Sequence, residues 1–432
     1  MRIKRVTVLF ALMALAVAAL VATSTAGAKT KARGVSGSIS VTGVWTGKEQ
    51  ASFQAVIDAF TKKNSGVKVK YTSSGDQTPT VLATAVQGGN PPDLAAVSQP
   101  GLMKDFAARG ALKSIDFAKG DIAKNYTPSW STLGSVKGKL YGLFFKGANK
   151  STIWYSVKSF KNAGVKAPTT WPQLLTAAKT LRASGTPAYS IGGADGWTLT
   201  DLFENIYLRS AGAAKYDQLT NHKIKWTDAS VKTALKDMAQ ILGDTKNIVG
   251  GTSGALQTDF PTSVSNVLNL APKAAMVMEG DFVPGVVKTT AKPIKDYNVY
   301  SFPTIGSTGQ SVVGGGDIVM MFKDTPASRA FVKFLASSEA ATIWAKRGGF
   351  SSPNKNVAAS SYSDPLNRST AIALAHAKTF RFDLSDLQPA AFGGTVGQGE
   401  FKIFQDFLKT PSNVNGIAAA LEKSAAAAYK KK

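Results

Sequence analysis

The chain of 432 residues contains no cysteine. This absence excludes disulfide bonds, thiolate metal sites and cysteine nucleophiles together. It also excludes a lipid anchor on a cysteine behind an export signal. We therefore expect a protein that is not attached to a membrane through cysteine.

Histidine and acidic residues are also scarce. His222 and His376 are the only histidines, so a zinc site with three histidines is impossible and a Ser-His-Asp triad has little basis. The 27 acidic residues face 51 lysines and arginines, which leaves few carboxylate pairs for a glycoside hydrolase. We expect no catalytic residues, no metal and no cofactor, and we keep a secreted glycoside hydrolase as the weakest alternative.

The basic residues give the chain a formal net charge of +24. Such a charge suits nucleic acid, anionic envelope polymers or anionic lipid surfaces. However, most lysines are scattered singly, with short runs only at Lys62–Lys63 and Lys430–Lys432. There is no arginine-rich stripe and no nucleic-acid-binding motif. The pattern favours a solvated positive surface and no nucleic-acid partner.

The N-terminus has the three parts of a secretory signal. Three basic residues within Met1–Arg5 precede an apolar run, Val6–Ala22, and small residues follow at Ala26–Ala28. We predict a signal peptide at 1–28 and export to the periplasm or the cell surface. The apolar run has 17 residues, the short edge of a membrane span, so an uncleaved N-terminal anchor is the alternative.

The remaining chain of about 400 residues is too long for one hydrophobic core and predicts two domains. After a flexible leader at 29–37, alternating apolar residues predict a strand at 39–44. Phe53, Ile57 and Phe60 lie on one face of a helix predicted at 49–63, and a second strand follows at 67–71. This β-α-β order predicts an α/β fold with a parallel pair of strands.

Further along, a buried-strand run at 140–145 is broken by the polar stretch Lys146–Lys150 and resumes at 153–155. We interpret this break as a hinge between two lobes. A mostly helical region follows, with helices predicted at 171–183, 200–210 and 230–242, then strands at 274–278 and 297–302 and a helix at 328–337.

Nine short segments match one family in order and spacing: Trp45–Glu49, Gly88–Asp93, Gln99–Gly101 with Arg109–Leu112, Leu140–Gly142, Thr170–Pro172, Gly196–Asp201, Ala275–Gly280, Gly348–Phe350 and Arg381–Asp386. On these segments the chain resembles the family 1 extracellular solute-binding proteins of carbohydrate ABC importers, and within them the α-glucoside-type branch. The resemblance covers essentially the whole chain behind the signal peptide.

The resemblance implies a two-lobed periplasmic-binding-protein fold with a hinge and a ligand cleft between the lobes. We place lobe one at 38–146 and 304–350, lobe two at 150–302 and 354–432, and the hinge crossings at 147–149, 303 and 351–353. It further implies a monomer that captures a carbohydrate and delivers it to ABC transporter permease subunits in the cytoplasmic membrane.

A sugar offers C–H faces and a rim of hydroxyl groups, so its site needs aromatic surfaces and hydrogen-bonding carboxylates. In open α/β sheets such residues follow the carboxyl ends of strands. The predicted ligand-binding residues are Trp45, Glu49, Asp76, Trp197, Glu279, Asp281, Phe282, Asp317 and Phe350. Phe282 matches a position where the related maltose-type proteins carry a sugar-stacking aromatic.

Each candidate also has a structural interpretation. The aromatic residues could pack in a core, as we expect for Trp154, Trp171 and Trp344, and the acids could be solvated turn carboxylates. We expect Asp93 to hold a turn, and Asp383 and Asp386 to cap the helix that follows them. Family members often carry arginine where this chain has Ser74, which leaves the contacts beside Asp76 open.

An anionic sugar derivative or an envelope polymer is the alternative ligand. Lysines that line the cleft would favour it, whereas lysines confined to the outer faces would favour retention in the envelope or a solvated shell.

Overall fold

The computed structural model describes residues 34–286, 296–307 and 309–430. The predicted signal peptide and residues 29–33 of the predicted leader lie outside this part. Ser36 and Gly37, which the sequence placed in the leader, instead begin the first strand because they pair with Gly66 and Val67. Among the described residues, no helix is long and apolar enough to cross a membrane.

The first lobe is built on a six-stranded sheet in the order β11-β10-β3-β1-β2, with β6 paired to β10. Its strands are β1 (Ser36–Gly43), β2 (Gly66–Ser73), β3 (Leu94–Val97), β6 (Gly142–Asn149), β10 (Val312–Met321) and β11 (Phe380–Phe382). Strand β1 pairs in parallel with β2 and β3, which confirms the predicted β-α-β start. Strand β10 runs antiparallel to β3 and β6.

Helices cover this sheet because their apolar residues fall on one face. In α2 (Gly47–Lys63), Phe53, Ile57 and Phe60 are all buried. Phe53 and Phe60 pack against α14 (Pro326–Leu335), whose Phe331 ring lies 6.3 Å from Phe53 and 4.8 Å from Phe60. The other elements of this part are α3 (Thr78–Gln87), α4 (Pro100–Ala108), α5 (Lys119–Asn125), α6 (Pro128–Leu133), α15 (Ser338–Ala345), α16 (Pro365–Ala375), the strands β4 (Ser135–Val136) and β5 (Lys139–Leu140), and the 3-10 turns η1 (Gly75–Gln77), η2 (Asp116–Ala118) and η4 (Ala359–Ser361).

The predicted break at Lys146–Lys150 is not where strand β6 ends. The strand continues to Asn149, and its residues 146–149 pair with Gly314–Asp317 of β10. The glycines of β10 allow this approach, since a Cβ atom on Gly316 would lie 2.7 Å from the Lys146 carbonyl oxygen. Strand β6 therefore continues past Lys146, which pairs with Asp317, because the next three partners on β10 are glycines.

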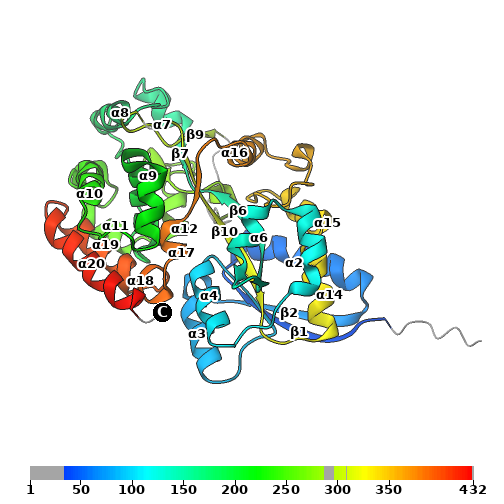
Figure 1. Ribbon diagram of the computed structural model, residues 1–432. Helices are drawn as coiled ribbons and strands as arrows, with labels where there is room; N and C mark the ends of the chain where they lie inside the picture. Colours follow the sequence, from blue (N-terminus) through cyan, green and yellow to red (C-terminus); the bar gives the residue numbers. More distant parts are fainter. Residues whose placement is uncertain (1–33, 287–295, 308, 431–432) are drawn as a thin grey trace, which may run out of the picture. The chain divides into compact units, whose positions relative to one another are not determined.

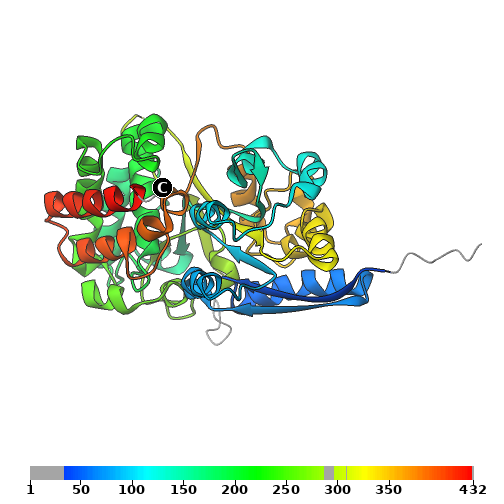
Figure 2. The same ribbon diagram turned by 60° about the horizontal axis from the view of Figure 1, so that its bottom comes forward.

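The second lobe combines a small antiparallel sheet, in the order β8-β7-β9, with most of the helices. Figures 1 and 2 show α9, α10, α19 and α20 gathered side by side, away from β1, β2 and α14. The elements are β7 (Thr152–Ser156), β8 (Met276–Met278), β9 (Tyr297–Ser301), α7 (Val157–Asn162), α8 (Trp171–Ala183), α9 (Trp197–Thr220), α10 (Ala229–Leu242), η3 (Thr245–Asn247), α11 (Gly251–Gln257), α12 (Phe260–Ser265), α13 (Val283–Val286), α17 (Leu384–Leu387), α18 (Ala390–Gly393), α19 (Gly399–Lys409) and α20 (Val414–Tyr429). Helix α9 is longer than the predicted 200–210 and bends at Gly212, where φ is +80°.

The chain passes between the two sheets or their helices at three places. The first passage is Lys150–Ser151, between β6 and β7; the second, residues 302–311, joins β9 to β10; the third is Asp383, between β11 and α17. Three features differ from the predicted boundaries. Ile305 still packs in the core of the second lobe. In addition, β11 pairs with β10 and α16 packs on β6, although the sequence placed both elements in lobe two. The lobe boundaries otherwise stay predictions.

We predict that Phe331→Ala lowers the free energy of unfolding by about 3–5 kcal/mol, because it leaves a cavity between α2 and α14. Chemical denaturation measures this loss. Lys333→Ala on the exposed face of the same helix is the control, and we expect a change within about 0.5 kcal/mol. Equal effects of the two variants would contradict the packing described for α14.

Candidate ligand-binding cleft

A cleft with a volume of about 390 Å³ opens beyond the carboxyl ends of β1, β2 and β3. The first lobe contributes the segments that follow these strands and the facing residues of β6 and β10. The second lobe contributes the N-terminal turn of α9, the start of α12, Phe282 and the α17 region. The position is the one expected for a ligand site in an open α/β sheet, and the volume lies in the range of small-molecule sites.

The structure brings six of the nine predicted ligand-binding residues together in this cleft. These six are Trp45, Glu49, Asp76, Trp197, Phe282 and Asp317. The other three, Glu279, Asp281 and Phe350, do not line it.

Each of the three outliers is held inside the protein. Phe350 is 0% exposed, and its ring lies 5.2 Å from that of Trp344 in the core of the first lobe. Asp281 is equally buried and accepts a hydrogen bond from the hydroxyl of Ser351. Glu279 borders a separate cavity of only about 20 Å³ behind the cleft wall. Proximity in sequence to Phe282 suggested these acids, but the backbone turns them inward.

Three aromatic rings form one wall of the cleft. Trp197 lies 5.0 Å from Phe260 and 6.4 Å from Phe282, and the two phenylalanine rings are 5.5 Å apart. They come from three different segments, the starts of α9 and α12 and the turn before α13. Sequence reasoning found Trp197 and Phe282 but missed Phe260, which follows the polar Thr258–Asp259. This wall is an apolar surface on which the C–H face of a sugar ring could pack.

Trp45 was predicted to bind the ligand, but its ring packs inside the first lobe. Its ring is 1% exposed and packs between Phe53 and Trp344. Its indole Nε1 donates a hydrogen bond of 2.6 Å to Asp317 Oδ2, while the hydroxyl of Ser98 donates one of 2.7 Å to Oδ1. Trp45 therefore fixes the Asp317 carboxylate at the cleft rather than offering its own face.

Lys146 lies between two of the predicted acids. Its ammonium pairs with Glu49 and lies 3.7 Å from Asp317 Oδ2. Burial opposes the charge on Lys146, but Glu49 and Asp317 outweigh it and raise the pKa of the lysine. Burial likewise raises the pKa of Glu49, although Lys146 counteracts part of this effect. Lys146 thus keeps its positive charge, and Glu49 and Asp317 compensate that charge within the protein.

Lys150 forms a second such cluster, four residues farther along the chain, with acids of the second lobe. Its ammonium lies 3.0 Å from Asp201 Oδ1 and 3.8 Å from Asp386 Oδ2, and it also pairs with Asp383. One cation cannot balance three buried carboxylates. Burial accordingly raises the pKa of Asp201 to about 8, whereas Lys150 outweighs burial at Asp383 and lowers the pKa of that carboxyl to about 2.

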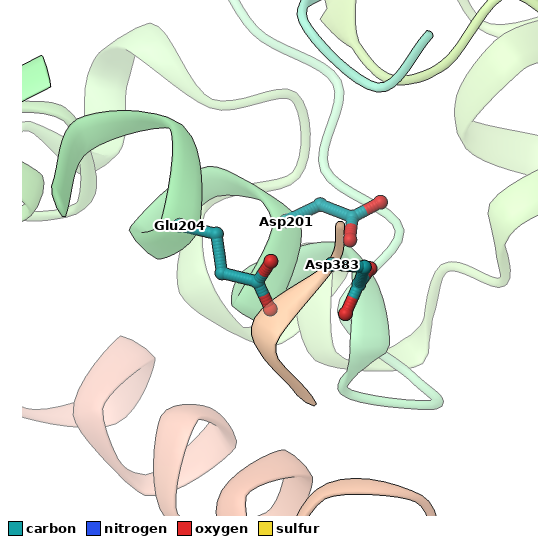
Figure 3. A group of neighbouring side chains, drawn as sticks. All are labelled: Asp201, Glu204 and Asp383. Carbon is teal, nitrogen blue, oxygen red and sulfur yellow. The ribbon is translucent and has the colours of Figure 1, made fainter. Parts of the chain in front are cut away.

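Figure 3 shows Asp201, Glu204 and Asp383, whose oxygens lie within 4.8 Å of one another. Protein donors already occupy most of these oxygens. Glu204 accepts from the hydroxyl of Tyr216 and from the backbone N–H groups of Leu384 and Ser385. Asp383 accepts from the N–H of Asp386 as the N-cap of α17, as predicted for Asp383. The donor set fits a hydrogen-bonded network rather than a metal cage.

At the mouth of the cleft the two lobes touch through Asp76 and Trp197. The indole Nε1 of Trp197 donates a 3.0 Å hydrogen bond to Asp76 Oδ2. Asp76 meets solvent, yet the surrounding protein desolvates it and Asp195 lies nearby, so its pKa rises to about 6. Asp259 in turn raises the pKa of Asp195, after the effect of burial. Three carboxyl groups therefore gather where the lobes meet.

Sequence reasoning missed both lysines and Asp201. A signal for the lysines was present, since Lys146 and Lys150 are the only charges in an otherwise apolar strand run. Asp201 lies four residues after Trp197, so the two share a face of α9. Burial of these charges could not be read from the sequence, because Asp383 is 233 residues from Lys150.

Comparisons with known proteins agree with this architecture. The family of bacterial extracellular solute-binding proteins matches residues 45–342. The alpha-glucosides-binding periplasmic protein AglE of Rhizobium meliloti is 32% identical over 402 residues, which cover 89% of this chain and 86% of that protein. The osmoprotective compounds-binding protein GgtB of Synechocystis is also 32% identical, over 84% of this chain and 86% of that protein.

Solved structures share the fold at lower identity. The bacterial solute receptor AcbH, described with a preference for β-D-galactopyranose, superposes with a TM-score of 0.81 at 17% identity and covers 91% of this chain and 100% of its own. The solute-binding protein RafE in complex with raffinose gives a TM-score of 0.73 at 18% identity, over 90% of this chain and 98% of its own. The two-lobed periplasmic-binding-protein fold is thereby confirmed.

The buried carboxyl groups predict how stability depends on pH. Burial moves the pKa of Asp201 from 3.8 to about 8, and burial also raises the pKa values of Glu204, Glu279, Asp386 and Glu400. At pH values between the ordinary pKa of these carboxyl groups and their raised pKa in the folded protein, the folded protein holds protons that the unfolded chain has released. Its stability therefore falls as pH rises through this range. We expect the melting temperature of the ligand-free protein to fall by at least ~3 °C between about pH 5 and pH 8.

Differential scanning calorimetry at constant ionic strength measures this fall. Asp201→Asn, which resembles the protonated carboxyl, should reduce it. A melting temperature that is constant or rises over this range would contradict the assigned protonation states.

Proposed function

Because this chain belongs to the bacterial extracellular solute-binding protein family, we propose that it captures a carbohydrate outside the cytoplasmic membrane and delivers it to the permease of an ABC importer. Membership of the family implies export. The family and the curated relatives are binding proteins, and we propose no enzymatic activity for this chain. We propose that it acts as a monomer, free in the periplasm or at the cell surface.

The observation that carries the sugar proposal is the aromatic wall opposite fixed carboxylates. Trp197, Phe260 and Phe282 offer an apolar surface on the second lobe. Asp317 and Glu49 face it from the first lobe, each oriented by its own protein partner. A bound sugar ring would pack on the first surface and donate its hydroxyl hydrogens to the second. An α-glucoside is our first candidate, because AglE is named for that class.

The charges in the cleft argue against an anionic ligand. Seven carboxyl groups line it, against two lysines, in a chain with a net charge of +24. Both lysines are already paired with carboxylates. A uronate or sugar phosphate would bring a further negative charge close to these acids, which is unfavourable in a partly desolvated site. We therefore propose a ligand without negative charge.

A calorimetric panel tests the proposal. We expect at least one neutral α-linked glucoside or small osmoprotective glycoside to bind with a Kd in the micromolar range or below, and matched uronates not to bind. Trp197→Ala should weaken binding by about 10–100-fold, because an aromatic surface of this size contributes about 1.5–3 kcal/mol.

Trp197→Phe is the matched control. It keeps an aromatic face but loses the hydrogen bond to Asp76, so we expect an intermediate affinity. If the folded wild-type protein bound no neutral sugar of the panel, the carbohydrate proposal would be refuted. Tighter binding of a uronate than of its neutral counterpart would refute the charge argument.

A further inference from the structure

Helix α9 carries a buried polar stripe through the second lobe. Glu204 and Asn205 follow Asp201 by three and four residues, and Arg209 follows Asn205 by four, so the four residues share one helix face. Each is at most 2% exposed. Buried polar and charged groups are costly unless they are hydrogen-bonded, and the partners of this stripe lie on the passages between the lobes.

The first passage, Lys150–Ser151, bonds to the middle of the stripe. The side-chain amide of Asn205 donates to the carbonyl of Lys150 at 2.9 Å, and the hydroxyl of Ser151 donates to Asn205 Oδ1 at 2.5 Å. The Lys150 ammonium reaches Asp201 one turn earlier, at 3.0 Å. Both the backbone and the side chain of this passage are therefore fixed to α9.

The other two passages bond to the same face. At the second, a guanidinium N–H of Arg209 donates to the carbonyl of Ser311 at 2.5 Å. Directly after the third, at the start of α17, Glu204 accepts from the backbone N–H groups of Leu384 and Ser385 at 2.7 and 2.9 Å. All three passages thus meet on one stripe of one helix.

The N-terminal end of the stripe reaches the ligand cleft. Asp201, Lys150 and Asp386 all line it. Asp201 and Asp386 are 2% and 3% exposed, and Oδ2 of each has no hydrogen-bond partner among the hydroxyl, amide and ammonium donors of the described part of the chain. The Asp201 carboxyl instead hydrogen-bonds to the carboxyl groups of Asp383 and Glu279, which requires shared protons. A hydroxyl group of a bound ligand could take the place of such a proton as the donor to Asp201.

We propose that Asp201 is a positioning residue that couples occupancy of the cleft to the geometry of the three passages, through Lys150 and Asp383. The proposal rests on the proposed sugar-binding function of the cleft. A ligand hydroxyl that donates to Asp201 Oδ2 stabilises the ionised carboxylate, and the proton of Asp201 leaves to solvent. The Lys150 ammonium is then shared more evenly between Asp201 and Asp383. Since these two residues flank the first and third passages, the lobes move to a new preferred angle.

The groups that face Asp201 determine its protonation. They are Lys150 on the first passage, Asp383 and Asp386 at α17, Glu279 after β8 and Glu204 on α9 itself. Only Lys150 among them is a cation. Burial and the acidic neighbours raise the pKa of Asp201 to about 8, so a proton is available for release at neutral pH.

A ligand-free experiment tests the coupling independently of the sugar. Raising the pH through about 8 ionises Asp201 as a ligand would. We expect small-angle scattering of the wild-type protein to show a change in radius of gyration between about pH 6.5 and pH 9, and Asp201→Asn to lose most of it. An unchanged radius in the folded wild-type protein, or an equal change in both proteins, overturns the proposal.

Calorimetry with the tightest sugar of the panel completes the test. In two buffers of different ionisation enthalpy at pH 7.5, the wild-type protein should release up to about one proton per ligand bound, and Asp201→Asn markedly fewer. Asp76→Asn is the control, because Asp76 lines the first lobe, does not contact the passages and is already largely ionised at this pH. Sugar binding without proton release refutes the coupling and leaves the sugar-binding function standing, whereas absence of any binding refutes that function alone.

Discussion

The structure depends on how one buried ammonium group is shared. Lys150 lies at the first passage between the lobes and faces three aspartates from two other segments. Removal of such a cation would leave buried carboxylates without compensation, at a cost that exceeds the value of an ordinary surface ion pair several times. The network therefore constrains more than its own residues. It ties the second turn of α9 and the start of α17 to the chain that leaves β6, and all three segments line the cleft.

The alternation of side chains along a strand explains why the ligand cleft and the passages between the lobes share residues. In a strand, alternate side chains point to the same face. Lys146, Ala148 and Lys150 all line the cleft, so both lysines of β6 and its extension point to the ligand side. The glycines of β10 allow β6 to continue to the passage without a break. A sugar in the cleft would therefore touch the strand that continues into the first passage, beside the Lys150 ammonium on which the proposed coupling through Asp201 depends.

The local order of the fold could be predicted from the sequence, because it depends on neighbours in the chain. The helices at 49–63 and 171–183 and the parallel pair of β1 and β2 follow from apolar spacing and turn residues. The residues of the cleft were predictable where they follow strands, as for Glu49 and Asp76. The failures have a common cause. Phe350 packs on Trp344 and Lys150 pairs with Asp383, and both outcomes depend on how separate segments of the chain come together. The spacing of apolar and polar residues within a segment does not contain this information.

The cleft is lined mostly by acidic residues, whereas the chain as a whole is strongly basic, and the two charges act over different distances. A net charge of +24 is a property of the whole chain, whereas affinity for a ligand depends on the charges within a few ångströms of it. Salt screens exposed lysines from one another beyond about 8 Å, but screens much less between groups inside a partly desolvated cleft. The acids of the cleft therefore keep a local field opposite in sign to that of the surface. An anionic envelope polymer attracted by the outer lysines would be repelled at the mouth by Asp76, Asp195 and Asp259. Retention near the cell through charge and capture of an uncharged sugar can thus coexist on one chain without competing for the same site.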